Sequence, residues 1–272
     1  MQWAARNAVL RDVALTVVHV AAPPATTWAS SLVPDDLDSW QLNTGTQVVA
    51  NAMNTAREAT GNDDALQMDS EFYTAITVPT LVDLSKRAQL IVVGSRGIGA
   101  VARVVLGSVS SALIRQAHCP VAVIKDDASI AAHAAALPVL VGIDGSPASD
   151  AATAVAFDEA KRRDVGLVAL HAWNDYSGCD VTGPNWSARE QQAKSILTER
   201  LTGWRERYPD VDLTTKVVCD SPAMQLVKES NNVQLVVVGS HGRGGFAGML
   251  LGSVSSAVVQ AVGVPVIVAR QP

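Results

Sequence analysis

The sequence predicts an α/β protein of two tandem domains, each built around a doubly wound parallel sheet. Continuous runs of Val, Ile and Leu recur along the chain. Such runs are typical of strands buried on both faces, as in parallel sheets. Segments with helical spacing separate the runs in both halves of the chain. This alternation of strand and helix implies right-handed crossovers between parallel strands.

The second half contains a complete set of these elements. Its predicted strands are Val139–Ile143, Leu167–His171, Leu213–Val218, Leu235–Val238 and Val264–Val268. Its predicted helices are Ser149–Arg163, Ser187–Tyr208, Ala223–Ser230 and Ser253–Val262. Because a helix follows each of the first four strands, this half is sufficient for one doubly wound domain.

The first half repeats this order but lacks its beginning. Its predicted strands are Leu15–Val20, Met68–Tyr73, Leu90–Val93 and Pro120–Ile124, and its predicted helices are Gln2–Arg11, Thr44–Thr60, Thr80–Lys86 and Ser108–Ala117. The segment NAVLRDVALTVVHV aligns with EAKRRDVGLVALHAW, which leaves LPVLVGIDGSPASD at 137–150 without a counterpart. We therefore expect the first domain to lack its first strand.

A missing strand leaves two buried strand edges without partners, at about 1–3 kcal/mol for each unsatisfied polar group. Either a neighbouring segment fills the gap or the natural protein begins upstream of Met1, and we adopt the second interpretation. The predicted organisation is a first domain at 1–126, an Ala-rich linker at 127–136 and a second domain at 137–272. Long loops are predicted after the second strand of each repeat, at 21–43 and 174–186.

The composition excludes several classes of protein. The 272 residues are 48% hydrophobic and 17% charged, which is typical of a globular chain. The net charge is −5, and Lys and Arg form no cluster that could follow a nucleic-acid backbone, so no nucleic-acid partner is expected. Three widely spaced cysteines without a ligand pattern predict neither a disulfide framework nor a metal site. They are Cys119, Cys179 and Cys219.

Residues 246–269 carry no charge and imitate a membrane span. The equivalent stretch of the first half contains Arg103, Arg115 and His118, which a lipid-facing helix would not tolerate easily. We therefore expect a buried helix followed by a buried strand, and no membrane partner. The N-terminus has no signal-peptide pattern, so the expected location is the cytoplasm.

A repeated glycine motif carries the functional prediction. VVGSRGIGAVARVVLGSVSSA at 92–112 returns 145 positions later as VVGSHGRGGFAGMLLGSVSSA at 237–257. Each copy places Gly-x-x-Gly after a strand and, nine residues later, Gly-Ser before a helix. Glycine lets backbone N–H groups approach a ligand closely, and successive N–H groups form an anion-binding nest. Because a helix N-terminus also favours phosphate oxygens, the motif predicts a cradle for a phosphate chain.

Other interpretations of the motif are weaker. The glycines could serve strand–helix packing, with Ser108 and Ser253 as N-caps, but two copies at identical spacing favour the cradle. The motif also matches a loose dinucleotide fingerprint, GxGxxA, yet it follows the fourth strand of its repeat and no acid follows it in the second copy. No P-loop pattern occurs in the chain.

Polar residues at strand ends are the remaining candidates. Asp144 ends the first strand of the second half, where ligands bind in open parallel sheets, and its carboxylate could accept hydrogen bonds from ribose hydroxyls. It could instead cap the next turn. His19 and His171 end equivalent strands, and we favour a structural role for both. Arg96 and His241 lie inside the glycine loops, where they could either reach phosphates or remain solvated.

These residues together resemble the universal stress protein family. The resemblance rests on VGIDGS, on the strand ends VHV and LHAW, and on G-x2-G-x9-G-[ST] followed by VSS. The tandem arrangement is similar to that of actinobacterial members, and the glycine–serine spacing is similar to that of the ATP-binding branch. The resemblance implies a five-stranded parallel sheet in the order 3-2-1-4-5, with ATP at the strand ends. It leaves open whether Mg²⁺ accompanies ATP.

The resemblance also implies a set of nucleotide-binding residues in each repeat. Asp144 would bind the ribose and Ala172 would line the adenine pocket. The phosphate residues of the second repeat would be Gly239, Gly242, Gly252, Ser253, Val254 and Ser255. Their counterparts in the first repeat are Gly94, Gly97, Gly107, Ser108, Val109 and Ser110, with Val20 in the place of Ala172. The ribose-binding aspartate has no counterpart there.

The expected function is that of an ATP-binding stress-regulatory protein that senses nucleotide with little or no catalysis. The second repeat should bind ATP, and the first should bind it weakly or not at all. Two alternatives stay open, a slow ATPase or other nucleotide-using enzyme and a scaffold that binds no nucleotide. The exposed edges at 120–124 and 264–268 favour a pseudo-dimer of the two repeats. A homodimer and a regulatory protein partner are left open.

Overall fold

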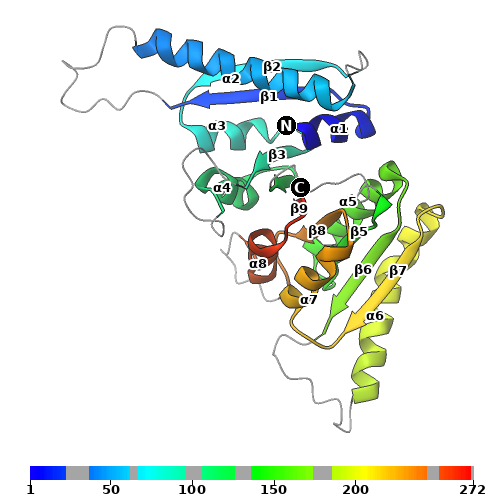
Figure 1. The fold of residues 1–272 in the computed structure, drawn as a ribbon. Helices are drawn as coiled ribbons and strands as arrows, with labels where there is room; N and C mark the ends of the chain where they lie inside the picture. Colours follow the sequence, from blue (N-terminus) through cyan, green and yellow to red (C-terminus); the bar gives the residue numbers. More distant parts are fainter. Residues whose placement is uncertain are drawn as a thin grey trace, which may run out of the picture. The chain divides into compact units, whose positions relative to one another are not determined.

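The structure, a computed structural model, describes residues 1–22, 37–61, 66–95, 106–125, 136–173, 186–243 and 251–270. The chain forms two compact units, Met1–Leu84 and Ser85–Pro272. These units do not coincide with the two sequence repeats, because the last two strands of the first repeat belong to the second unit (Figure 1).

The second unit is built on a seven-stranded sheet with the order β3-β4-β9-β8-β5-β6-β7. The strands are β3 (Ile91–Gly94), β4 (Val121–Ile124), β5 (Val139–Gly142), β6 (Leu167–Ala172), β7 (Leu213–Val218), β8 (Leu235–Gly239) and β9 (Val266–Ala269). All neighbouring strands are parallel except β4 and β9. Within the second repeat the order β7-β6-β5-β8-β9 is the expected 3-2-1-4-5, so the predicted fold class is confirmed.

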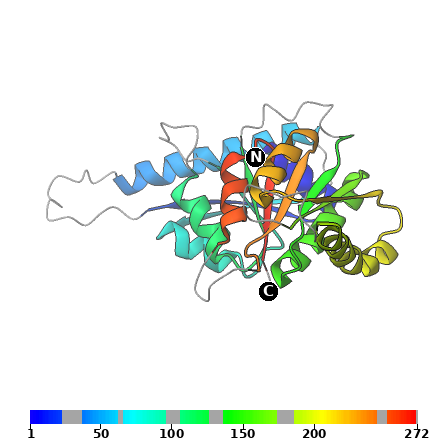
Figure 2. The ribbon, with the colours of Figure 1, turned by 90° about the horizontal axis from the view of Figure 1, so that it is seen from below.

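Helices cover both faces of the second repeat (Figures 1 and 2). They are α5 (Pro147–Arg163), α6 (Trp186–Arg207), α7 (Pro222–Glu229) and α8 (Ser253–Ala261), with a 3-10 turn at Ser230–Asn232. The helix α5 packs on β5, β8 and β9 and contacts α6, whereas α7 contacts α8. Small residues allow the close approach of α5, since Ala152, Ala156 and Ala160 are fully buried. Burial on both faces explains why β5, β8 and β9 consist mainly of Val, Ile and Leu.

The antiparallel pair β4–β9 joins the two repeats into one sheet. Its register pairs Ala122 with Ile267. The residue after each of these strands donates to the last turn of a helix in the other repeat. Lys125 Nζ donates to the carbonyl of Gln260 in α8, and Arg270 Nη1 donates to the carbonyl of Ile114 in α4 (Ser108–Gln116). The predicted pairing of the two exposed strand edges is therefore confirmed, with contacts that follow a pseudo-two-fold relation.

The first unit holds the rest of the first repeat. Its elements are α1 (Gln2–Arg11), β1 (Leu15–Ala21), α2 (Leu37–Ala59), β2 (Met68–Thr74) and α3 (Thr77–Leu84). The strands β1 and β2 are parallel, and Ala5, Ala8, Ala56 and Leu66 form the apolar cluster between helix and sheet. Among the described residues β1 pairs with β2 alone and β3 with β4 alone, as expected for a repeat without its first strand.

The loop predicted at 21–43 is wrong in its last part, because α2 begins at Leu37. Residues 23–36 of that loop lie outside the described residues, as do most of the predicted linker and of the loop at 174–186. Equivalent elements otherwise agree closely between repeats. The helices α1 and α5 both end at an aspartate in the left-handed region, Asp12 with φ of 53° and Asp164 with φ of 54°.

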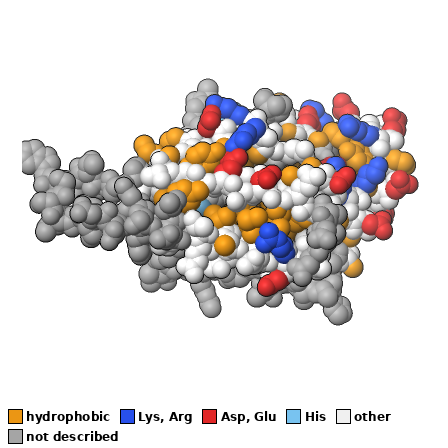
Figure 3. Space-filling model, turned by 90° about the horizontal axis from the view of Figure 1, so that it is seen from above, with side chains coloured by type: hydrophobic (Ala, Val, Ile, Leu, Met, Phe, Trp, Pro, Cys, Tyr) orange, Lys and Arg blue, Asp and Glu red, His pale blue; other side chains and the backbone are white. Residues whose placement is uncertain are grey.

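On the face shown in Figure 3, basic and acidic side chains lie interspersed among polar and apolar ones. Among the described residues no helix has the length and apolar character to cross a membrane. The expected buried strand is β9, whereas α8 buries only one face, with Ser255, Val258 and Val259. Cys119 is free and buried, and burial raises the pKa of its thiol.

One expectation about cysteines is wrong, because Cys219 is disulfide-bonded. Cys219 follows β7 at the carboxyl edge of the sheet, and the third cysteine, Cys179, lies outside the described residues.

Candidate functional site

A cavity of about 710 Å³ opens at the carboxyl ends of β5, β6 and β8. This is the position where the strand order of the second repeat reverses, and ligands bind there in open α/β sheets. All eight residues that the family resemblance implied for the second repeat line this one cavity. They are Asp144, Ala172, Gly239, Gly242, Gly252, Ser253, Val254 and Ser255.

Asp144 stands between β5 and the glycine loop. Its Oδ1 accepts a hydrogen bond from the backbone N–H of Ser146 over 2.8 Å, and its Oδ2 accepts one from the N–H of Arg243 over 3.0 Å. The hydrogen bond from Ser146 confirms the interpretation that Asp144 caps the next turn. Each carboxylate oxygen has a further lone pair, so the side chain can accept hydrogen bonds from a ligand as well. Asp144 therefore orders the loop and faces the cavity.

Close contacts require two glycines of the motif, Gly239 and Gly242. A Cβ atom on Gly242 would lie 2.6 Å from Asp144 Oδ2. A Cβ atom on Gly239 would lie 2.7 Å from the backbone carbon and oxygen of Ala148 in α5. The packing interpretation therefore holds for Gly239, because α5 leaves no room for a side chain. Packing and access to the cavity are compatible uses of the same residues, since both depend on the absence of a side chain.

The loop returns to the sheet at the start of α8. The N–H of Gly252 donates to the carbonyl of Ser240 over 2.7 Å, and the hydroxyl of Ser255 donates to the carbonyl of Gly239 over 2.5 Å. Gly252 is the N-cap of α8, which has no side-chain cap, so the N-cap interpretation of Ser253 is wrong. Ser253 instead occupies the first helical position, exposed at the cavity wall.

The opposite end of the cavity is apolar. It is formed by side chains that end β5 and β6 and by the first turns of α7. They are Ile143, Leu170, Ala172, Trp173, Pro222, Ala223 and Leu226. The backbone N–H of Trp173 donates to the carbonyl of Val218, which extends the pairing of β6 with β7. The cavity thus has an apolar end, a carboxylate in the middle and a glycine–serine end.

His171 has the structural role that we favoured. Its ring is 2% exposed, and Nδ1 lies 2.6 Å from the carbonyl oxygen of Ile143. Burial lowers the pKa of His171, and the charge of Arg243 acts in the same direction. The neutral ring with a proton on Nδ1 therefore ties the end of β6 to the end of β5, one residue before Asp144.

His241 and Arg243 occupy the glycine loop of the second repeat. Nδ1 of His241 lies 3.0 Å from the hydroxyl of Ser240, and both His241 and Arg243 line the cavity. The sequence reasoning missed Arg243 and Trp173. The signal for Arg243 was present in the repeat alignment, which places Ile98 opposite it. The glycines are identical in the two copies of the motif, whereas the arginine is present in the second copy and replaced by isoleucine in the first.

The implied residues of the first repeat do not all belong to one unit. Val20 lies on β1 in the first unit, whereas Gly94, Gly107, Ser108, Val109 and Ser110 lie in the second unit, and Gly97 and Arg96 lie outside the described residues. The described phosphate half has the same geometry as that of the second repeat. The hydroxyl of Ser110 donates to the carbonyl of Gly94 over 2.6 Å, and the N–H of Gly107 donates to the carbonyl of Ser95 over 2.8 Å.

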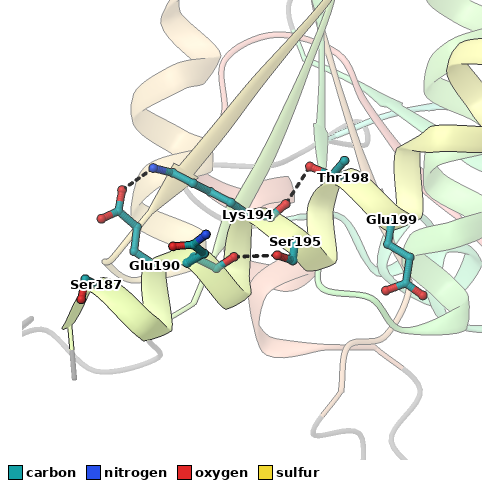
Figure 4. Close-up of a pocket in the computed structure, with 7 residues that line it drawn as sticks. Ser187, Glu190, Lys194, Ser195, Thr198 and Glu199 are labelled. Carbon is teal, nitrogen blue, oxygen red and sulfur yellow. Dashed lines mark hydrogen bonds and ion pairs between the residues drawn. The ribbon is translucent and has the colours of Figure 1, made fainter.

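A second hollow, of about 770 Å³, runs along α6 (Figure 4). Its described lining residues all belong to this helix, and they bond to one another along it. Lys194 Nζ lies 2.7 Å from Glu190 Oε1, and the hydroxyls of Ser195 and Thr198 donate to carbonyls one turn earlier. Neither a glycine cradle nor an apolar end is present among these residues, so the hollow is no candidate for a nucleotide.

No group of three or more His, Cys, Asp or Glu side chains in the described part of the chain is placed to hold a metal ion. Among the described lining residues of the main cavity, the titratable side chains are Asp144, His171, His241 and Arg243.

The chain belongs to the universal stress protein family. The family matches residues 1–125 and 137–270, one domain for each sequence repeat. A universal stress protein of Mycobacterium tuberculosis is 54% identical over 269 residues, which are 99% of this chain and 91% of the relative. Another from the same organism is 50% identical over 271 residues, covering 100% of this chain and 91% of the relative. The tandem arrangement resembling actinobacterial members is thereby confirmed.

Among solved structures, the crystal structure of a universal stress protein from Archaeoglobus fulgidus matches with a TM-score of 0.73. The match covers 100% of this chain and 92% of that chain at 20% identity. At this identity the comparison supports the fold.

Proposed function

We propose that the second repeat binds ATP in the cavity at the carboxyl ends of β5, β6 and β8, and that the protein acts as a nucleotide-sensing regulator. The observation that carries the proposal is the order of chemistry along the cavity. An apolar end suits a purine, the carboxylate of Asp144 suits ribose hydroxyls, and the glycine loop with the N-terminus of α8 suits phosphates.

The lining residues also support little or no catalysis. Both carboxylate oxygens of Asp144 already accept backbone N–H groups, and burial favours the neutral form of His171, whose Nδ1 faces the carbonyl of Ile143. Both groups thus hold backbone atoms around the cavity, which supports a binding role for them rather than proton transfer. We further propose a cytoplasmic location. The pairing of β4 with β9 supports a pseudo-dimer within the chain. Association into homodimers and a regulatory protein partner belong to the same proposal.

Calorimetric titration with ATP, with and without Mg²⁺, tests the proposal. The wild-type chain should bind one ATP, and Asp144→Ala should lower the affinity about tenfold to a hundredfold, because hydrogen bonds to a charged group contribute about 1.5–3 kcal/mol. The control is Asp150→Ala, which removes an exposed carboxylate of α5 that pairs with Arg200 outside the cavity. Absence of heat with the wild type, or an unchanged affinity in Asp144→Ala, would contradict the proposal.

Release of phosphate or AMP separates sensing from turnover. The proposal expects no steady release at saturating ATP. Release that scales with protein concentration and disappears in Gly252→Asp would instead identify a nucleotide-using enzyme, because a carboxylate at the start of α8 repels phosphates.

A further inference from the structure

Arg243 is an exposed residue that lines the cavity. Its Nη2 atom is 2.8 Å from the position that a Cβ atom on Gly145 would take, so the guanidinium covers the turn after Asp144. Gly145 has φ of 79°, in the region that favours glycine. At Gly145, the loop after β5 therefore has the backbone conformation and the free space that allow the guanidinium of Arg243 to lie over it.

The base of the Arg243 side chain is held in place by the backbone. Its N–H donates to Asp144 Oδ2, and the preceding residue, Gly242, has no space for a side chain beside the same oxygen. The side chain of Arg243 therefore begins where the carboxylate of Asp144 contacts the glycine loop. Because Asp144, Arg243 and Ser253 at the start of α8 line the same cavity, a group bound there has the guanidinium within its surroundings.

Arg243 brings a positive charge to a cavity whose described lining holds one carboxylate, that of Asp144. Among the described lining residues it is the single permanently charged cation, and its guanidinium makes no hydrogen bond or ion pair with a described residue. A guanidinium offers five N–H donors in a planar fork that matches phosphate oxygens. In the cavity as it stands, these donors are available to a ligand.

The first repeat carries the same glycine motif without this cation. The alignment of the two glycine motifs places Ile98 opposite Arg243, although the flanking glycines are shared. An apolar residue is therefore compatible with the same motif. A structural role for the guanidinium in shaping the loop is not required by the sequence pattern.

We infer that Arg243 determines specificity for the number of phosphates, so that the cavity selects nucleoside triphosphates over monophosphates and nucleosides. The inference rests on the proposed function, because it assigns a residue to the phosphate end of that site. In the proposed site the apolar end contacts the base and Asp144 contacts the ribose, and both groups are the same in the nucleoside and its phosphates. The guanidinium adds attraction only when a polyphosphate chain is present.

Titration with ATP, ADP, AMP and adenosine tests the inference on the wild-type chain and on Arg243→Gln. The variant should lose about tenfold to a hundredfold in affinity for ATP, less for ADP, and keep its affinity for adenosine. Arg243→Lys should recover part of the loss, because a point charge replaces the fork. The matched control is Arg200→Gln, an arginine of α6 that does not line the cavity.

The outcomes separate this inference from the proposed function. An unchanged ratio of ATP to adenosine affinity in Arg243→Gln would overturn the inference, and so would a parallel loss for all four ligands, which a merely structural role would produce. A wild type that binds ATP and adenosine equally well would also overturn it while leaving nucleotide binding intact. A wild type that binds none of the four would contradict the proposed function itself.

Discussion

The strand–loop–helix unit β3–α4 of the first repeat and the unit β8–α8 of the second have the same hydrogen bonds in different surroundings. In each, the serine two residues into the helix donates to the carbonyl of the strand's last glycine, and the N-cap glycine donates to the carbonyl of the residue after that strand. Around β8, however, α5 and β5 complete a cavity with Asp144 at its centre. Gly239 is buried, whereas Gly94 is exposed.

The comparison teaches that the glycine–serine motif specifies a local geometry but not a binding site. In the cavity of the second repeat, the neighbouring strands β5 and β6 lead to the carboxylate of Asp144 and to part of the apolar lining. The loop side chain adds a further difference, since Arg243 stands opposite Ile98 in the alignment. A shared motif in two repeats is therefore weaker evidence for two sites than the residues that surround each copy.

The largest difference between repeats should appear when each strand-end glycine becomes alanine. In Gly239→Ala the new Cβ would lie 2.7 Å from backbone atoms of Ala148, and backbone cannot rotate away. We expect a loss of at least about 1–3 kcal/mol in the free energy of unfolding, as for overpacked cores. Urea unfolding followed by circular dichroism measures this change.

Gly94→Ala is the matched variant, and its exposed position predicts a change within about 0.5 kcal/mol. Equal losses in the two variants would show that the surroundings of the motif do not differ in the way that the contacts indicate.

A pH-dependent difference should follow from His171. Its pKa is lowered in the folded protein by burial, so the unfolded chain binds more protons than the folded chain once the pH falls below about 6.5, the ordinary value for histidine. The stability contributed by neutral His171 is therefore present above this pH and is lost as the pH falls toward the folded pKa. His171→Asn, whose amide can still donate to the carbonyl of Ile143, should reduce the slope of stability against pH below 6.5.

Chemical denaturation across pH 5–8 measures this slope, and His19→Asn is the control for loss of a strand-end imidazole. His19 stacks on Phe72 instead, with ring centroids 5.6 Å apart. An identical slope in the wild type and His171→Asn would refute the assignment of the acid sensitivity to His171.

The smallest effect is expected at the pseudo-two-fold contacts between repeats. Lys125→Ala and Arg270→Ala each remove one donor to a helix carbonyl of the other repeat, and each should cost about 0.5–1 kcal/mol. Similar losses would support the two-fold relation. Arg205→Ala, at an exposed position of α6, should leave the unfolding midpoint unchanged, and a larger effect there than at Lys125 or Arg270 would argue against it.

Much of the fold could be predicted because strand and helix periods are strong local signals. The bounds of β7 and α1 agree with the prediction, and the missing first strand was visible from the repeat alignment. The start of α2 at Leu37 was missed because the segment before it read as one long loop. The disulfide at Cys219 was missed because the wide spacing of the three cysteines gave no signal for it.

The candidate site was predicted in its residues but not in its connections. Asp144 was expected to act either as a cap or as a ligand, and the structure shows that its two oxygens hold a turn and a distant loop at once. This link joins residues 99 positions apart and has no local sequence signal. Arg243 was missed because its position differs between the repeats, whereas the motif is defined by the residues that the repeats share.

The antiparallel pair β4–β9 determines how the chain can be divided. The strands β3 and β4 are hydrogen-bonded into the sheet of the second repeat, so a cut between the repeats would leave them attached by backbone hydrogen bonds. A fragment that begins at Leu137 would expose the edge of β9, whose residues are fully buried in the whole chain. Such an apolar edge pairs readily with another strand. The pair β4–β9 therefore holds parts of both repeats in one sheet.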